Sequence, residues 1–166
     1  PKVAAYDLQL FLDMAWNINS VSPTTIDRHL DNWLCSQFGK EAGTRLLPVM
    51  TEYYRLCGIR KPEFMGWSQT ELDKKKYPRG LSPVQKSDFT PSEINDYLSS
   101  YRKLKDAVAD IERCISPQLR DAYFAAIKYP VFAAADMSIK LLDSKNAMTA
   151  YNEIMSMTDY YNHQLA

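Results

Sequence analysis

The chain has few of the residue types that mark several common classes of protein. Its 166 residues include five glycines and nine prolines, too few for a linker or a disordered tail. Twenty basic side chains balance twenty acidic ones, so no excess charge points to nucleic acid or to an anionic membrane. No apolar run approaches the ~20 residues of a membrane span, and no basic segment followed by an apolar stretch predicts a signal peptide.

Cysteine and histidine are also scarce. The isolated cysteines, Cys35, Cys57 and Cys114, form no CxxC pair and are a poor disulfide framework, so we expect small buried apolar side chains. His29 and His163 lie far apart in the sequence and predict no metal site. There is no glycine-rich phosphate loop and no GxSxG motif. We therefore expect no catalytic, cofactor-binding or metal-ligating residue in this chain.

Apolar residues recur at helical spacing over most of the sequence. Helices are expected over residues 6–17, 22–38, 40–57 and 90–115, from 116 onward, and over 146–166. No Asn-Gly or Asp-Gly turn and no alternating β-branched run predicts a hairpin. The predicted fold class is all-α, an antiparallel helical bundle of about five to six helices with one long loop at about 59–90.

Local signals indicate where several helices begin and end. Ser22 is the expected cap of the second helix, with Pro23 at its first helical position and Gly39 after its end. Gly58 predicts a left-handed stop after the third helix. Pro48 falls inside that third helix and should kink it or mark its true start.

The fourth helix has the most complete pattern. Thr90 and Glu93 form the expected capping box, with Pro91 between them. The apolar residues that follow step by three and four, as on one face of a long bundle helix: Ile94, Leu98, Tyr101, Leu104, Val108, Ile111 and Ile115. Later in the chain, Pro130 should kink the next helix near Lys128.

Two places carry charges that the helical pattern does not require. Asp13 is an acid among apolar residues, and we expect it to be a hydrogen-bonded partner of a helix end or of an arginine. Arg60, Lys61 and Glu63 gather around Pro62 at the start of the long loop. The two cations suit the end of a helix, but Glu63 is left unexplained. We expect Arg60 or Glu63 to anchor this loop, either to the bundle or to a neighbouring domain.

Five short motifs occur in order along nearly the whole chain. They are Asp13-Met14-Ala15-Trp16, Trp33…Phe38-Gly39, Arg60-Lys61-Pro62-Glu63, Tyr129-Pro130-Val131 and Tyr161-Asn162. Each motif alone is weak, but the ordered set resembles the helical region of glycoside hydrolase family 115, the xylan α-glucuronidases.

The resemblance implies a role within a larger enzyme. Family members are multidomain enzymes, typically dimeric, that remove α-1,2-linked glucuronic acid or its 4-O-methyl ether from xylan. Their catalytic centre is on a (β/α)8 barrel that precedes the helical bundle, and a β-sandwich region follows. Because this sequence has no repeated strand–helix units, it contains no barrel, and no catalytic residue is carried over.

We therefore expect residues 1–166 to be a single helical bundle domain from a larger enzyme, inactive alone; the first residue, proline rather than methionine, agrees with this. Its expected partners are the catalytic barrel and the β-sandwich of the same chain, and a second copy in a homodimer. Glucuronoxylan would be the parent substrate, with no nucleic acid and no membrane as partner. The candidate structural or interdomain contacts are Asp13, Arg60, Lys61, Glu63, Trp67 and Tyr129.

Two other functions stay open at this point. A freestanding helical module could bind a partner helix through its apolar stripes. Alternatively, Trp67, Tyr77 and Arg79 in the long loop could bind carbohydrate. The free cysteines favour a reducing compartment, whereas the resemblance favours a secreted or periplasmic protein of a bacterium, which is the location we predict.

Overall fold

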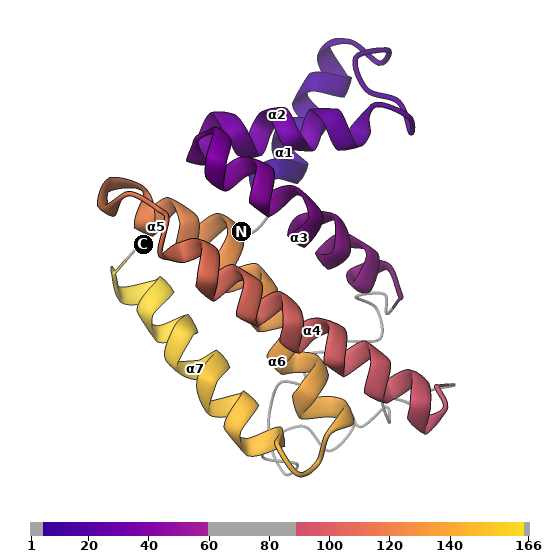
Figure 1. Ribbon diagram of the computed structural model, residues 1–166, viewed down its shortest axis with the longest axis vertical. Helices are drawn as coiled ribbons and strands as arrows, with labels where there is room; N and C mark the ends of the chain where they lie inside the picture. The colour runs from indigo at the N-terminus through magenta and orange to yellow at the C-terminus, as the bar shows by residue number, and fades with distance from the viewer. Residues whose placement is uncertain (1–4, 60–88, 165–166) are drawn as a thin grey trace.

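The computed structural model describes residues 5–59 and 89–164, and this part of the chain is helical with no strand (Figure 1). The α-helices are α1 (Ala5–Trp16), α2 (Ile26–Phe38), α3 (Lys40–Ile59), α4 (Pro91–Glu112), α5 (Arg120–Tyr123), α6 (Tyr129–Leu142) and α7 (Ala147–Gln164). A 3-10 turn at Pro117–Leu119 and a π-helical turn at Phe124–Lys128 flank α5. The all-α prediction is confirmed, whereas the loop residues 60–88 lie outside the described residues.

Helix α4 lies at the centre of the arrangement. It packs against α3 on one side and against α6 on the other, while α7 packs against α6 and α2 against α3. Helix α6 runs antiparallel to α4, and α7 runs antiparallel to α6 (Figure 1). Helices α1 and α2 lie together at one end of the molecule. The residues that were expected to line one face of α4 form the core: Leu98, Tyr101, Leu104, Val108, Ile111 and Ile115 are buried, and Ile94 is half-buried.

The capping box at the start of α4 is confirmed. The Glu93 backbone N–H donates to Thr90 Oγ1 at 3.3 Å, and the Thr90 backbone N–H donates to Glu93 Oε2 at 2.7 Å. These bonds satisfy two backbone groups at the helix start and its flank. Gly39 follows the end of α2 with a φ of 84°, so its expected place as a helix terminator is also confirmed.

The predictions for Ser22 and Gly58 were wrong. Helix α2 begins at Ile26, because the Ser22 backbone N–H donates to Thr25 Oγ1 at 2.9 Å and the residues between them form a turn instead. Helix α3 continues through Gly58 to Ile59, and Gly39 is the only glycine with positive φ in the described ranges. The burial of Leu56 keeps this last turn against the core, so the local glycine signal does not end the helix.

The two prolines have different effects. Pro48 lies inside α3 and does not mark its start, which is at Lys40. The predicted disturbance before Pro130 takes the form of the π-helical turn, in which the Tyr129 backbone N–H donates to the Phe124 carbonyl five residues back. A wider turn accommodates a proline that lacks an N–H and whose ring would crowd the preceding turn.

The expectation that all the cysteines are buried was wrong. Cys35 and Cys57 are half-buried, Cys114 is exposed, and all are free thiols. Cys114 lies beyond the end of α4, where the chain turns toward the solvent, and its Sγ accepts a hydrogen bond from Arg45 Nη1 at 3.0 Å.

Candidate functional site

One face of α1 is apolar and exposed to solvent. Leu8, Phe11, Leu12 and Trp16 are 59%, 66%, 52% and 93% exposed. Their spacing of three and four residues places them on one side of the helix. Ile18, just beyond the helix, is 76% exposed. We call these residues the α1 apolar surface: Leu8, Phe11, Leu12, Trp16 and Ile18.

The other face of α1 is also apolar and packs on the protein. Tyr6 is buried, and its ring centroid lies 5.5 Å from that of Trp33 and 6.0 Å from that of Tyr54. Leu10 packs on the same core. A helix with apolar residues on two faces is typical of an element covered on both, yet among the described residues α1 is covered on one of them alone.

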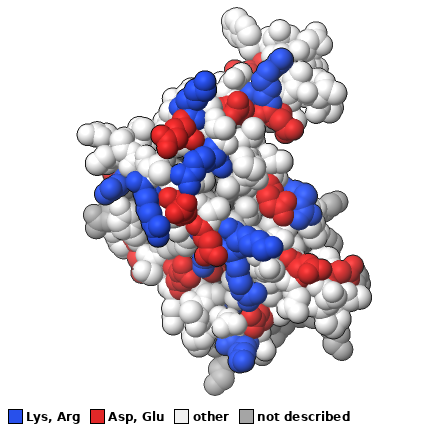
Figure 2. All heavy atoms as spheres, viewed as in Figure 1, with Lys and Arg blue, Asp and Glu red and all other residues white. Residues whose placement is uncertain are grey.

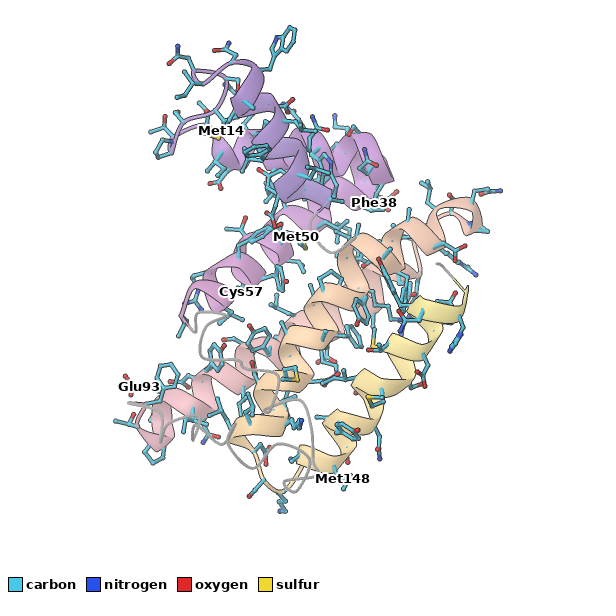
Figure 3. All side chains as sticks on the ribbon, turned by 180° about the vertical axis from the view of Figure 1, so that it is seen from behind. Met14, Phe38, Met50, Cys57, Glu93 and Met148 are labelled. Carbon is cyan, nitrogen blue, oxygen red and sulfur yellow. The ribbon has the colours of Figure 1, made fainter. Side chains whose placement is uncertain are left out.

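The segment that runs from the end of α1 to the start of α2 has no charged side chain. Residues 14–26 contain no Asp, Glu, Lys or Arg. The corresponding end is nearly all white in Figure 2, whereas acidic and basic side chains alternate over the rest of that face. Figure 3 labels Met14 at this end and Met148 at the opposite end of the molecule. The surface is therefore suited to a neutral, apolar partner.

Asp13 fixes the inner side of α1 to α2. His29 Nε2 lies 2.9 Å from Asp13 Oδ2, and His29 Nδ1 lies 3.3 Å from the Tyr6 hydroxyl. Gln9 Nε2 donates to Asp13 Oδ1 at 2.9 Å. The hydrogen bonds from Gln9 and then His29 lower the pKa of Asp13 below its ordinary value. Because both ring nitrogens of His29 are engaged, this cluster positions α1 and offers no free base.

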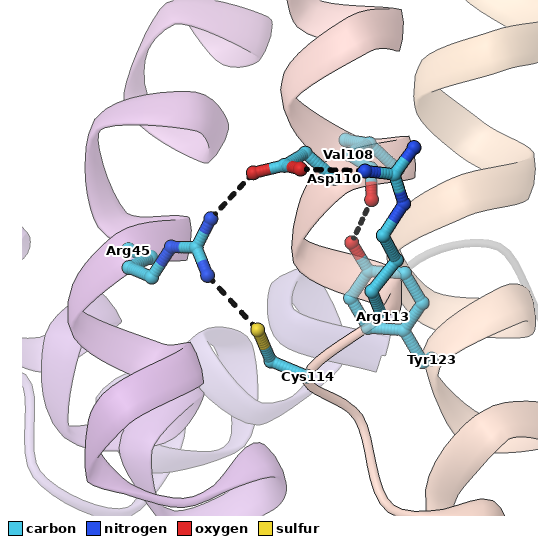
Figure 4. A network of polar contacts seen from close by, with 6 residues as sticks. All are labelled: Arg45, Val108, Asp110, Arg113, Cys114 and Tyr123. Atoms are coloured by element: carbon cyan, nitrogen blue, oxygen red, sulfur yellow. Dashed lines mark hydrogen bonds and ion pairs between the residues drawn. The ribbon is translucent and has the colours of Figure 1, made fainter.

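The α3–α4 joint fixes the first helices to the rest of the molecule (Figure 4). Arg45 on α3 donates from Nη2 to Asp110 Oδ2 at 2.7 Å and from Nη1 to the Cys114 thiol. Behind this bridge, the buried Tyr123 hydroxyl donates to the Val108 carbonyl at 2.8 Å. The bonds of Arg45 hold α3 against the C-terminal part of α4, whereas the Tyr123 bond joins α5 to α4.

The other candidate residues divide into two groups. Tyr129 lies between α6 and α7, where its hydroxyl is 3.0 Å from Thr158 Oγ1 and its ring stacks on Tyr161 at 4.9 Å. It therefore joins two helices of the bundle. The remaining candidates lie outside the described residues, as do the loop residues considered for carbohydrate: Arg60, Lys61, Glu63, Trp67, Tyr77 and Arg79.

Other types of site are not found in this part of the chain. Within residues 5–59 and 89–164, no group of three or more His, Cys, Asp and Glu side chains could hold a metal ion. No helix in these ranges has the length and apolar character needed to cross a membrane.

The exposed face of α1 was not anticipated from the sequence. The signal was available, because Leu8, Leu12 and Trp16 lie on one face while Tyr6 and Leu10 lie on the other.

The first part of the chain matches the model of a known protein family. The model of the family described as glycosyl hydrolase family 115 matches residues 1–64. This range includes the motifs at 13–16, 33–39 and 60–63 and the whole α1 apolar surface, whereas the motifs at 129–131 and 161–162 lie outside it. No protein with a curated description matches the chain. Residues 1–64 therefore confirm the resemblance to glycosyl hydrolase family 115, and the chain contains a helical domain related to the glycoside hydrolases.

Proposed function

We propose that the chain is an accessory helical domain of an enzyme that removes glucuronic acid, or its 4-O-methyl ether, from glucuronoxylan. In this proposal the domain does no chemistry itself and buttresses the catalytic barrel of the same polypeptide. The match of residues 1–64 to glycosyl hydrolase family 115 supports the class of parent enzyme. A polymer such as xylan is degraded outside the cytoplasm, so we also propose a secreted or periplasmic location.

The α1 apolar surface is the observation that carries the buttressing role. Burying a side chain of the size of Leu, Ile or Phe contributes about 1.5–3 kcal/mol, and tryptophan is one of the residue types enriched among the residues that dominate binding at interfaces. Trp16, at 93% exposure, therefore leaves much apolar area in water unless a partner covers it. The family match falls on the segment that bears this surface, which favours the rest of the enzyme as that partner.

Cross-linking within the full-length protein tests where the surface docks. A photoreactive phenylalanine analogue at Phe11 should cross-link to residues of the same polypeptide that lie outside this chain. The matched control is the same analogue at Met148, in the first turn of α7, where the side chain is 59% exposed. This control should give few cross-links to the rest of the polypeptide. Cross-links from Phe11 only to a second copy, or none at all, would favour a dimer interface or a freestanding module and contradict the proposal.

Activity measurements test whether the catalytic residues lie outside the 166-residue chain. The full-length protein should release glucuronic acid or its methyl ether from glucuronoxylan, and the isolated 166-residue chain should release none. Release by the isolated chain would overturn the claim that the chemistry lies elsewhere. A full-length protein that is inactive on glucuronoxylan would contradict the proposed substrate. The cross-links from Phe11 would still test separately whether α1 contacts the rest of the enzyme.

A further inference from the structure

Lys105 joins three helices through two carboxylates. From α4 its ammonium donates to Asp136 Oδ1 on α6 at 2.6 Å and to Glu153 Oε2 on α7 at 2.8 Å. The same ammonium lies 4.8 Å from the centre of the Phe132 ring. One ammonium group therefore pairs with two carboxylates, one on α6 and one on α7.

Asp136 is the unusual member of this group. The residue is 1% exposed, and its Oδ2 is buried with no hydrogen-bond partner. A buried carboxylate needs compensation for the water it has lost, and Lys105 bonds to just one of its two oxygens. Burial raises the pKa of Asp136 to about 6, although Lys105 opposes the rise.

Helix α7 is held on the bundle in part by polar contacts of this kind. Among its described side chains, Ala150 is the one buried residue. Its other connections include the Glu153–Lys105 ion pair, the contact of Thr158 with Tyr129 and the stacking of Tyr161 on Tyr129. Met157 also packs on the core and the Tyr160 ring lies 4.7 Å from that of Phe124, so a change in the charge around Lys105 would act on α7 alongside these apolar contacts.

A cleft of about 410 Å³ lies beside this group, between α4, α6 and α7. The charged side chains that line it with Asp136 are Arg102, Lys105 and Asp106 from α4 and Glu153 from α7. Arg102 is paired with Asp143 at 2.9 Å, so its charge is already engaged. The cleft brings solvent close to the ion group, which allows a proton to reach Asp136 after a small local opening.

We propose that Asp136, Lys105 and Glu153 form a pH-sensitive clamp that holds α7 on α4 and α6 more firmly in mildly acidic solution than at neutral pH. With Asp136 protonated, its carboxyl group carries no buried negative charge, and the ammonium of Lys105 pairs with the charge of Glu153 alone. With Asp136 ionised, Lys105 is shared, and a buried negative charge with one unpartnered oxygen favours opening toward water.

The sign of the effect follows from proton binding. The pKa of Asp136 is about 6 in the folded protein against an ordinary value of 3.8 for an aspartate. The closed state therefore binds more protons than the open state between these values, and the stability of the closed state falls as pH rises through this window. Between pH 5 and 7.5 this difference corresponds to a loss of about tenfold in the closed-to-open ratio.

Hydrogen exchange on the 166-residue chain tests the clamp. After correction for intrinsic rates, amides of α7 should be about tenfold less protected at pH 7.5 than at pH 5. Asp136→Asn should abolish this difference. Asp110→Asn, which removes a carboxylate paired with Arg45 at the α3–α4 joint, should leave it intact.

Two results would overturn the proposal: equal protection of wild-type α7 at both pH values, or a pH dependence that persists in Asp136→Asn. Lys105→Met provides a second variant should Asp136→Asn fail to fold. Removing the cation should raise the pKa of Asp136 further, so the loss of protection should move to higher pH. An unmoved transition in Lys105→Met would also contradict the clamp.

Discussion

Gly43 on α3 faces the backbone of Cys35 on α2 at very short range. A β carbon on Gly43 would lie 2.6 Å from both Cys35 Cα and Cys35 N, and 2.7 Å from its Sγ. The two helices meet at the corner around Gly39, and this contact sets how closely they approach. Because α2 also holds α1 through His29, the position of the α1 apolar surface depends on this close approach.

Gly43→Ala should therefore destabilise the chain. Backbone atoms of Cys35 cannot move aside as a flexible side chain could, so we expect a loss of at least about 1–3 kcal/mol in the free energy of unfolding, as for overpacked cores. Urea denaturation followed by circular dichroism measures this value.

Gly58→Ala is the matched control. Gly58 is helical, and a β carbon there would meet no heavy atom within 4 Å. Alanine should stabilise the chain by about 0.5–1 kcal/mol because it favours the helix. Equal effects of the two substitutions would contradict the close approach at Gly43.

The buried hydrogen bond from Tyr123 to Val108 should contribute modestly to stability. Tyr123→Phe removes the donor while keeping the ring, so we expect a loss of about 0.5–1.5 kcal/mol. Tyr123→Ala leaves a cavity at a side chain with 0% exposure and should cost about 3–5 kcal/mol. Thermal unfolding separates the two, and Tyr160→Phe, at a 43% exposed site, should change little. A loss in Tyr123→Phe as large as in Tyr123→Ala would show that the hydroxyl, rather than packing, dominates.

Asp13 should stabilise the chain above acidic pH. Gln9 and His29 lower the pKa of Asp13 in the folded protein, so its contribution is present above the ordinary aspartate value of 3.8 and is lost as pH falls through the folded pKa. Asp13→Asn should therefore destabilise the chain at pH 6 and have a smaller effect at pH 2.5. Denaturation at the two pH values measures this difference. Its sign is opposite to that expected for Asp136, and an equal effect of Asp13→Asn at both pH values would rule out the ionic contribution.

The α1 apolar surface should contribute nothing to the stability of the isolated chain. Replacing Leu8 and Phe11 together by serine should change the free energy of unfolding by no more than about 0.5 kcal/mol per site, because both side chains are exposed. In the full-length protein the same substitutions should lower the melting temperature, since an interface would be lost. Leu34→Ala, at a fully buried site in α2, should destabilise both forms by about 2–5 kcal/mol. A large loss from the serine variant in the isolated chain would show that α1 is packed on both faces.

Local signals predicted much of the fold. Thr90 and Glu93 formed the expected capping box, and the regular spacing of apolar residues in α4 matched its buried face. The prediction that α3 ends at Gly58 was wrong, because packing of Leu56 on the core extends the helix beyond a residue type that often ends helices. Local sequence carries no information about which elements will pack on a helix end.

The candidate sites were harder to predict for the same reason. The apolar pattern of α1 indicated burial but not that one face has no partner within the described residues. Asp136 stood within an apolar run, yet its pairing with Lys105 spans 31 positions and depends on how α4 and α6 pack. Asp13 was expected to bond to a helix end or to an arginine, but its carboxylate bonds instead to Gln9 on its own helix and to His29 on α2.

Radical footprinting of Trp16 tests most directly whether the α1 apolar surface is an interdomain contact. In the isolated chain this side chain is 93% exposed, so it should be oxidised rapidly. In the full-length protein the proposal predicts that oxidation of Trp16 is much slower, because residues at the centre of an interface are removed from solvent, while Met148 is oxidised equally in both. Equal oxidation of Trp16 in the two proteins would contradict the account.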